Sequence, residues 1–475
     1  MRKLIHLALL LAVTLVTCNP PSNSDKSADQ KSSAAVKRRY MVFLQPSYVK
    51  PIALRDFDKM DETTRTKTRA EIQATISSFM GDLGFTGDSL KTYVDLVVAF
   101  SSLMTEEQAA TFQADHVKVQ SVLSDLKIEG RPIQQGRPIQ QDARIEKDAT
   151  DITAAQDWGL TQSGSVWTSC AVSTAGGTPN TPTSSTLIWI IDTGIATGRP
   201  GTNPYLNVKV DLGRNFTSTG GELAFEDDNG HGTMVAGVAA ARSISWRPSG
   251  SSTQTLVAGV APGAPVVPLK VLDSKGEGDW QWVIDALTHI YVNYPTKRGD
   301  VINLSLGEFL GKGGTCGTQY DGIKTAIENL VRERDHFVVI ASGNDGRKVK
   351  RALPGCLNFD RTLRNKIVIV AAAACDRQCV LFSNLGRKVD FVAVGTNVFT
   401  TYLKNAQGWQ FFVGSGTSLS AAVVSGIIQS SGRLPRTNGP KITCYPRDYD
   451  PDDTGTGDPP FDHVYTYAVR RAPEE

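Results

Sequence analysis

The chain has 475 residues, and its 50 Lys and Arg nearly balance its 48 Asp and Glu, which gives a formal net charge of +2. This balance excludes the strong single-sign field with which proteins bind nucleic acid or an anionic membrane surface. A hydrophobic content of 40% and a charged content of 21% are typical of a soluble globular protein, and the length allows two or three domains.

Residues 1–18 have the pattern of a signal peptide. Arg2 and Lys3 precede a short apolar run over residues 4–16, which is too short to span a bilayer comfortably. Cys18 follows directly, and residues 15–18 resemble the cleavage box of a bacterial lipoprotein, although a Thr precedes the Cys. We therefore expect export, either by ordinary secretion or with a lipid anchor on Cys18, to the extracellular space or the cell envelope.

The next two segments differ in composition. Residues 19–38 are rich in Ser, Asn, Asp and Lys without an apolar period, which predicts a disordered tether. Residues 39–126 predict a small α+β module in the order strand, helix, strand, helix, strand. The strands are expected at 40–44, 94–100 and 117–122 and the first helix at 62–83. The second helix is expected to begin after Thr105, in a capping box with Gln108.

Residues 127–157 are interpreted as a linker that contains a processing region. Residues 130–135, Gly-Arg-Pro-Ile-Gln-Gln, are repeated at once in residues 136–141. Two copies with Gly and Pro do not form a regular helix, and an exposed linker is where processing proteases cut. The sequence therefore predicts an exposed segment here.

Residues 158–475 predict an α/β domain. Apolar runs alternate with helical segments and Gly-rich loops, which indicates buried parallel strands with helices on both faces. Ligand sites in such sheets lie at the carboxyl ends of the strands. The part that follows Ser430 is expected to be irregular. The expected strands lie at residues 187–191, 266–272, 300–306, 337–341, 366–373 and 389–394.

Three motifs carry the chemistry. Asp192 ends an apolar strand in residues 188–194, His231 begins a helix of small residues, and Ser418 lies in a Gly-rich turn into another helix. A serine hydroxyl needs an adjacent base to become a nucleophile, a histidine can accept its proton near neutral pH, and a buried carboxylate orients that histidine. The three residues are therefore predicted to form a catalytic triad.

With their Asp, His, Ser order, these motifs resemble the subtilase family over residues 158–430, and in detail its proteinase K branch. The resemblance implies a subtilisin-like parallel sheet, a serine endopeptidase that acts on proteins or peptides, and no required cofactor. Residues 338–346 resemble the oxyanion segment, which would make Asn344 a donor to the tetrahedral intermediate. By the same resemblance, the substrate-binding residues would be Ser305, Leu306, Gly307, Ala341, Ser342, Gly343, Gly276 and Gly278.

Residues 39–126 resemble the family's inhibitor-type propeptide. Such a leader would assist folding, occupy the cleft with its C-terminal end, and then be cut away. We therefore expect the chain to be its own intramolecular inhibitor and to process itself between about 125 and 150. Some positions near the triad depart from the family pattern, and all are expected to be packing positions: Met234, Leu419, Ser420 and Ala422.

Cysteines and acidic residues leave alternatives open. Besides Cys18 there are six cysteines, which permit three disulfides in 15 connectivities. Metal binding at Cys375 and Cys379 is the second interpretation of that pair. The resemblance allows structural calcium, which the sequence does not place. Candidate oxygens are those of Asp211, Asp227, Asp228 and Asp360.

The competing functions differ in class. The leading hypothesis is an endopeptidase of broad specificity, and the second is a protease that processes one precursor. The third is a catalytically impaired protein that keeps the fold as a binding module. An α/β-hydrolase esterase is excluded, because residues 416–420 lack the Gly-x-Ser-x-Gly pattern and the order of the catalytic residues is wrong.

Overall fold

The computed structural model divides the chain into two compact units, residues 1–36 and residues 37–475. The predictions for residues 1–18, for Cys18 and for most of 19–38 lie outside the described residues, and the account below concerns the second unit. No helix within the described part of the chain is long and apolar enough to cross a membrane. The structure describes residues 36–55, 59–85, 91–124, 127–130, 135–140, 160–163, 166–178, 181, 183–198, 203–221, 224–246, 254–294, 299–311, 314–406, 408–445 and 464–471.

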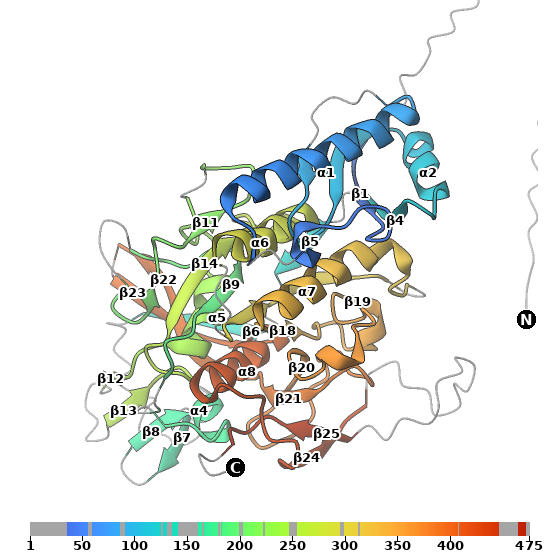
Figure 1. Ribbon diagram of the computed structural model, residues 1–475. Coiled ribbons are helices and arrows are strands. Elements are labelled where there is room, and N and C mark those ends of the chain that lie inside the picture. Colours follow the sequence, from blue (N-terminus) through green and yellow to red (C-terminus); the bar gives the residue numbers. More distant parts are fainter. Residues whose placement is uncertain are drawn as a thin grey trace, which may run out of the picture. The chain divides into compact units, whose positions relative to one another are not determined.

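The leader forms the predicted α+β module, shown in blue in Figure 1. Its antiparallel sheet has the order β2-β3-β1-β4, so one more short strand is present than expected. The capping box of α2 is confirmed, because the Thr105 hydroxyl accepts from the Gln108 N–H at 3.2 Å and the Gln108 side chain accepts from the Thr105 N–H at 2.9 Å. The elements are β1 (Arg38–Leu44), η1 (Ile52–Leu54), α1 (Glu62–Asp82), β2 (Lys91–Tyr93), β3 (Ala99–Met104), α2 (Glu106–Ala114) and β4 (Val119–Ser124).

An aromatic cluster forms the core of the leader. Phe112 of α2 makes edge-to-face contacts with Phe79, Phe85 and Phe100, at ring-centroid distances of 5.8, 5.6 and 5.2 Å. Helix α1 presents Ile72 and Ile76 to the same core, at the helical spacing that the sequence predicted. Each large buried ring contributes a large apolar area to so small a module.

A largely parallel sheet is the centre of the second domain. Its order among the described residues is β10-β14-β9-β16-β18-β20-β21-β25-β24, with β11 also paired to β14. All six predicted strands are present, and every residue of β9, β16 and β18 is buried, so both faces are covered. The strands are β9 (Ile188–Asp192), β10 (Asn207–Val208), β11 (Arg214–Asn215), β14 (Pro265–Lys270), β16 (Val301–Leu304), β18 (Phe337–Ala341), β20 (Ile367–Ala373), β21 (Phe391–Val394), β24 (Lys441–Thr443) and β25 (Val464–Tyr467).

Helices pack around this sheet (Figure 1). Helix α5 contacts α8, and α6 contacts α7. An Asp279 side chain caps α6 by accepting from the Gln281 N–H at 2.6 Å, and α7 ends at Asp335 in the left-handed conformation. The helices are α4 (Cys170–Thr174), α5 (His231–Ala240), α6 (Trp280–Asn293), α7 (Asp321–Arg334) and α8 (Thr417–Ser431), with short 3-10 turns η3 (Thr318–Tyr320), η4 (Val349–Arg351) and η5 (Arg361–Leu363).

Three smaller sheets lie outside the central one. The first has the order β15-β5-β17-β19, the second β22-β23-β6 and the third β12-β13-β8-β7. Their strands are β5 (Lys127–Gly130), β6 (Gln135–Gln140), β7 (Leu160–Ser163), β8 (Val166–Ser169), β12 (Ile244–Trp246), β13 (Gln254–Val257), β15 (Glu277–Asp279), β17 (Leu306–Phe309), β19 (Ala352–Leu353), β22 (Val398–Asn405) and β23 (Gly408–Ser415).

Two expectations about irregular segments are corrected. The predicted linker contributes β5 and β6 to these sheets, so these residues are in regular structure; Ile128 of β5 is fully buried, while Lys127 and Glu129 are exposed. The tail after Ser430 was expected to be irregular, but β25 pairs in parallel with β21 and β24 pairs with β25. In the linker and in the tail, the strand conformation depends on pairing with a neighbouring strand, because the local sequence alone does not specify it.

The six cysteines of residues 37–475 form three disulfides, Cys170–Cys375, Cys316–Cys356 and Cys379–Cys444. The prediction of three bridges is therefore confirmed, and the sequence could not have chosen this connectivity from fifteen. The alternative of a metal at Cys375 and Cys379 is wrong, because each is bonded to a different cysteine.

The leader contacts α6 and α7 through specific side chains. Lys91 forms an ion pair with Asp285 at 2.5 Å, and the Asn329 amide donates to the backbone oxygen of Leu96 at 2.8 Å. The ring of Phe43 lies so close to Gly322 that a Cβ there would be 2.2 Å from it. Only glycine fits at this point of the contact, and the leader is therefore packed closely onto these helices.

Candidate active site

Asp192 lies at the carboxyl end of β9, the strand near the middle of the sheet. Its side chain is fully buried, and its Oδ1 accepts a hydrogen bond from the Thr193 N–H at 2.7 Å. In a parallel sheet this end of the strand is where loops can gather functional side chains. The position is the one that the sequence predicted.

His231 is the first residue of α5, and Ser418 is the second residue of α8. The His231 Nδ1 lies 2.7 Å from Asp192 Oδ1, and its Nε2 lies 3.0 Å from Ser418 Oγ. The structure thus brings together three residues that lie far apart in the sequence, with hydrogen-bonding distances throughout. His231 is 5% exposed and Ser418 is fully buried in this form of the chain.

Glycine is required just before His231. Gly230 has a φ of 107°, in the region that L side chains rarely adopt, and a Cβ there would lie 2.2 Å from the Tyr402 ring. The Tyr402 hydroxyl also donates to the backbone oxygen of Asn229 at 3.3 Å. A tight turn packed under an aromatic ring therefore fixes the start of the helix that carries His231.

Asp227 connects the Asp192 turn with the His231 helix. Its Oδ1 accepts from the Thr193 hydroxyl at 2.9 Å and from the Asn229 and Gly230 N–H groups at 3.0 and 2.8 Å. Its Oδ2 accepts from the N–H and hydroxyl of Thr233 at 2.9 and 2.6 Å. This buried carboxylate is fully used by protein donors, so it does not fit as a calcium ligand.

Two other calcium candidates, Asp228 and Asp360, are paired with cations. Asp228 pairs with Lys270 at 2.7 Å, and Asp360 pairs with Arg332 at 2.6 Å and caps η5. Hydrogen bonds from Arg332 and from Thr362 lower the pKa of Asp360 to about 2. Within the described ranges, His, Cys, Asp and Glu form no group of three that could hold a metal ion.

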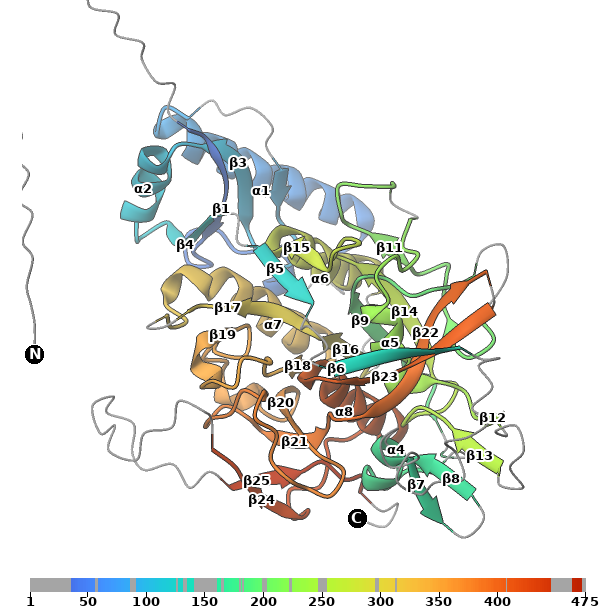
Figure 2. The ribbon, with the colours of Figure 1, turned by 180° about the vertical axis from the view of Figure 1, so that it is seen from behind.

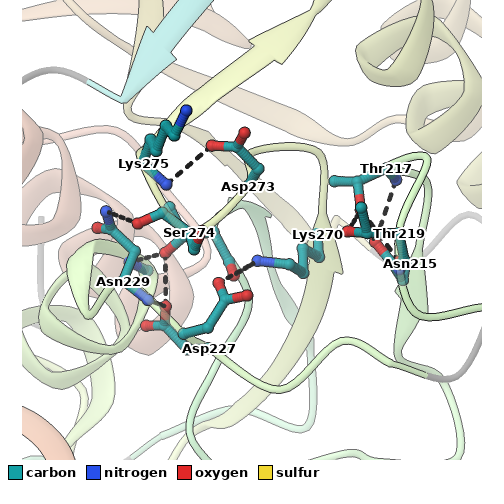
Figure 3. Close-up of polar contacts among 12 residues, drawn as sticks. Asn215, Thr217, Thr219, Asp227, Asn229, Lys270, Asp273, Ser274 and Lys275 are labelled. Carbon is teal, nitrogen blue, oxygen red and sulfur yellow. Dashed lines mark hydrogen bonds and ion pairs between the residues drawn. The ribbon is translucent and has the colours of Figure 1, made fainter.

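Lys270 is a buried cation beside the triad that the sequence analysis missed. It is 2% exposed and is labelled in Figure 3. Its Nζ donates at 2.7 Å both to the backbone oxygen of Thr193 and to Asp228. The same figure shows the Asn229 amide, which donates to the backbone oxygen of Ser274 at 3.1 Å. These bonds tie the loops after β9 and before α5 to the end of β14. The sequence feature that could have revealed it is a charged lysine within the apolar run that precedes Asp273.

Asn344 follows β18 and is held by Thr417, the neighbour of Ser418. Its Oδ1 accepts from the N–H and from the hydroxyl of Thr417 at 2.9 and 2.8 Å. The amide nitrogen is therefore the end of the Asn344 side chain that can face a substrate. The hydroxyl of Thr417 also accepts from the Gly343 N–H at 3.2 Å.

The predicted substrate-binding edges hold a segment of the chain itself (Figure 2). Strand β5 lies between β15 and β17 and is antiparallel to both, with Gly278 opposite Ile128 and Gly307 opposite Glu129. The Gly130 N–H donates to the backbone oxygen of Gly276 at 2.9 Å. Gly130 itself lies against the triad, since a Cβ added to it would be 3.4 Å from the Nδ1 of His231.

The remaining predicted substrate-binding residues follow β16 and β18 or lie at their ends, and one of them, Ser305, is bonded to Ser418. The Ser305 hydroxyl donates to the backbone oxygen of Ser418 at 3.1 Å, and Leu306 begins β17. Ala341 and Ser342 are fully buried at the end of β18, where the Ser342 hydroxyl donates to the backbone oxygen of Asn384 at 2.8 Å.

The comparisons agree with this geometry, since residues 183–430 match the model of the family described as the subtilase family, Peptidase S8. The chain belongs to the subtilase family. Thermitase of Thermoactinomyces vulgaris is 31% identical over 254 residues, which are 53% of this chain and 77% of thermitase. The intracellular serine protease of Paenibacillus polymyxa is 30% identical over 238 residues, which are 49% of this chain. The chain spans only 63% of that relative's length.

A solved structure supports the subtilisin fold. The epidermin leader peptide processing serine protease of Staphylococcus aureus superimposes with a TM-score of 0.53 at 17% identity, over 83% of this chain and 87% of that one. At this identity the likeness concerns the fold alone. It confirms the expected α/β class, a largely parallel sheet with helices on both faces.

The departures from the subtilase pattern are packing positions, as expected. Met234 is 5% exposed, and Leu419, Ser420 and Ala422 are fully buried. The Ser420 hydroxyl donates to the backbone oxygen of Ala393 at 3.2 Å, which ties α8 to β21. None of the four displaces a hydrogen bond of the triad.

Proposed function

We propose that this subtilase is a serine endopeptidase that hydrolyses peptide bonds with Asp192, His231 and Ser418. The observation that carries the proposal is the unbroken line of hydrogen bonds from Asp192 through His231 to Ser418. In this mechanism Ser418 Oγ attacks the scissile carbonyl carbon while His231 Nε2 accepts the hydroxyl proton. His231 then returns the proton to the leaving amine, and water completes the second half of the reaction in the same way.

Asp192 and Asn344 would support this chemistry without exchanging protons. Asp192 holds the His231 ring with Nε2 toward Ser418 and stabilises the imidazolium that forms. Asn344 would donate an amide N–H to the oxyanion, together with the backbone N–H of Ser418, at the start of α8. Donors placed in advance at a buried site stabilise developing charge without reorganisation, and one such donor is worth about 10²–10³ in rate.

The leader is proposed to be an inhibitor that the enzyme removes from itself. Support comes from β5, which takes the place of a peptide substrate between β15 and β17 and ends against His231. The leader sheet also packs on α6 and α7, which places β5 next to its own anchoring module. We propose that the chain cuts itself between about 125 and 150 and then releases the part before the cut, which includes residues 39–126.

Substrate class and location follow the same proposal. Pairing of β5 with two edges suits an extended protein or peptide substrate, recognised mainly through its backbone. The small residues Ala341, Ser342 and Gly343 would leave room for a large apolar side chain at the cut. The signal pattern of residues 1–18 supports export of the precursor, with either free secretion or lipidation of Cys18.

The test compares the wild-type chain with Ser418→Ala, each expressed at full length. Both are treated with a fluorescent serine-directed phosphonate, assayed on denatured casein, and followed by intact mass. We expect a labelled, shortened wild type and an unlabelled mutant that keeps its leader, with a loss of casein hydrolysis of at least about 10⁴-fold. A Ser418→Ala chain that matures alone would disprove self-processing, and two folded but unlabelled chains would favour a binding protein without turnover.

A further inference from the structure

A buried amide, Asn384, binds the loop that carries Asn344. Asn384 is fully buried in the segment between β20 and β21. Its Oδ1 accepts from the N–H groups of Asp345 and Arg347 at 3.1 and 2.8 Å. Its Nδ2 donates to the backbone oxygen of Ser342 at 3.1 Å and to Asp345 Oδ2 at 2.8 Å. One side chain thus holds this loop on both sides of Asn344.

The backbone of Asn384 is attached to the same loop. Its N–H donates to the backbone oxygen of Gly343 at 2.9 Å, and its own oxygen accepts from the Ser342 hydroxyl at 2.8 Å. The preceding residue, Ser383, is 1% exposed, and its hydroxyl accepts from the Ala372 N–H of β20 at 2.9 Å. Because β20 pairs in parallel with β18, Asn384 connects the loop after β18 to the neighbouring strand of the central sheet.

Two sets of hydrogen bonds therefore determine where the amide nitrogen of Asn344 lies. Thr417 holds the Oδ1 of the Asn344 side chain, and Asn384 holds the backbone on either side of it. An asparagine side chain is short, so a shift of its backbone moves the amide nitrogen by a similar amount. Hydrogen bonds weaken steeply when their geometry is lost, and a misplacement of about 1 Å can cost about 100-fold in rate.

We propose that Asn384 is a positioning residue for the oxyanion donor, which acts on the reaction through Asn344 and not through the substrate. This inference rests on the proposed endopeptidase function and deepens it. Because Asn384 acts through Asn344, its removal costs no more than the loss of that donor, which is worth about 10²–10³ in rate. Its removal also has no effect on the rate once the donor is absent.

The test uses the mature enzyme produced from the full-length chain, with kcat and KM measured on one peptide and active sites counted by complete phosphonate labelling. Asn384→Ala should lower kcat about 10- to 100-fold with little change in KM. In an Asn344→Ala enzyme, the same substitution should change kcat by less than about twofold, because the donor that it positions is gone.

The chain offers a matched control in Asn215, a buried amide labelled in Figure 3. Its Nδ2 donates to the backbone oxygens of Thr219 and Gly221, so it closes a different loop with the same kind of bonds. Asn215→Ala should therefore keep the wild-type kcat. A loss of kcat in this control as large as in Asn384→Ala would reduce the effect to general loosening and overturn the inference.

A milder variant keeps the test decisive if Asn384→Ala does not fold. Asp345 is exposed, and Asp345→Ala removes the carboxylate that accepts from Asn384 while the backbone N–H remains. It should lower kcat about two- to fivefold, the worth of one hydrogen bond, and should have no effect in the Asn344→Ala enzyme.

Three results would overturn the inference and leave the proposed function intact, since the wild type still cleaves the peptide in each. They are an unchanged kcat in the folded variants, a loss that multiplies with that of Asn344→Ala, and a higher KM without a lower kcat. If the folded wild type did not cleave peptides, the proposed function would fail, and this inference with it.

Discussion

The leader core and the interior around the triad hold their side chains by different forces. In the leader, Phe112 is packed by three aromatic neighbours, whose contribution is mainly buried apolar area. Beside the triad, Asp227 is fixed by five donors within 3.0 Å, each of which specifies a direction. Apolar packing therefore determines the folding stability of the leader. The directional hydrogen bonds around the triad determine the positions of the reacting atoms.

The largest expected effect tests the leader side of this comparison. Phe112→Ala removes a fully buried ring and should destabilise the leader by about 3–5 kcal/mol. We expect a lower yield of shortened enzyme from the full-length chain but an unchanged kcat per phosphonate-labelled active site. Phe112→Leu, which keeps most of the volume, should lose much less yield. An altered kcat in either variant would show that the leader core also affects the geometry of the active site.

The second largest expected effect tests the hydrogen-bonded interior around the triad. Asn344→Ala should lower kcat by about 10²–10³, with little change in KM, because the lost donor acts on the oxyanion and not on the bound substrate. The measurement is steady-state kinetics on one peptide, with thermal unfolding as a check of folding. Thr417→Ser keeps the hydroxyl that orients Asn344 and should stay near wild-type rate. A proportionate rise in KM would instead place Asn344 in ground-state binding.

The smallest effect concerns Asp390, a buried carboxyl that accepts from the Ile369 N–H at 2.8 Å. Burial raises its pKa from 3.8 to about 6, because the charged form is poorly solvated there. The folded state therefore holds this proton more tightly than the unfolded state, so the stability contributed is present below pH 4 and is lost as the pH rises through 6.

Asp390→Asn, made in the inactive Ser418→Ala chain, should remove this loss. We expect the variant to gain up to about 3 kcal/mol in the free energy of unfolding at pH 8 relative to its parent, and little at pH 4. Urea unfolding at the two pH values measures the difference. If the free energy of unfolding changed equally between the two pH values in both chains, Asp390 would not titrate in this range.

The fold and the triad could be predicted because their signals are local. Each core strand is a continuous apolar run, and Asp192, His231 and Ser418 each lie in a short motif at a strand or helix end. Asn344 was found only through the resemblance of residues 338–346 to the subtilase oxyanion segment, and the structure places it against Thr417, beside Ser418. Packing then brings these ends together at one edge of the sheet.

What could not be predicted depends on partners distant in the sequence. Strand β6 exists because β23 lies beside it, and β25 exists because β21 does. Asp227 was taken for a calcium candidate, but its Oδ2 accepts hydrogen bonds from the N–H and hydroxyl of Thr233. Its donors include the hydroxyl of Thr193, 34 residues earlier in the chain, and the sequence alone does not bring these two residues together.

The tail also protects the sheet. Without β25 and β24, the edge of β21 would present unpaired backbone groups to any extended chain nearby, and such edges promote aggregation. Within the described residues the outermost strand at this edge is β24, which has only three residues, begins with Lys441, and is followed by the Cys379–Cys444 bridge. A protein proposed to act on extended polypeptide thus offers that polypeptide the edges beside its triad, while this short, charged border discourages pairing elsewhere.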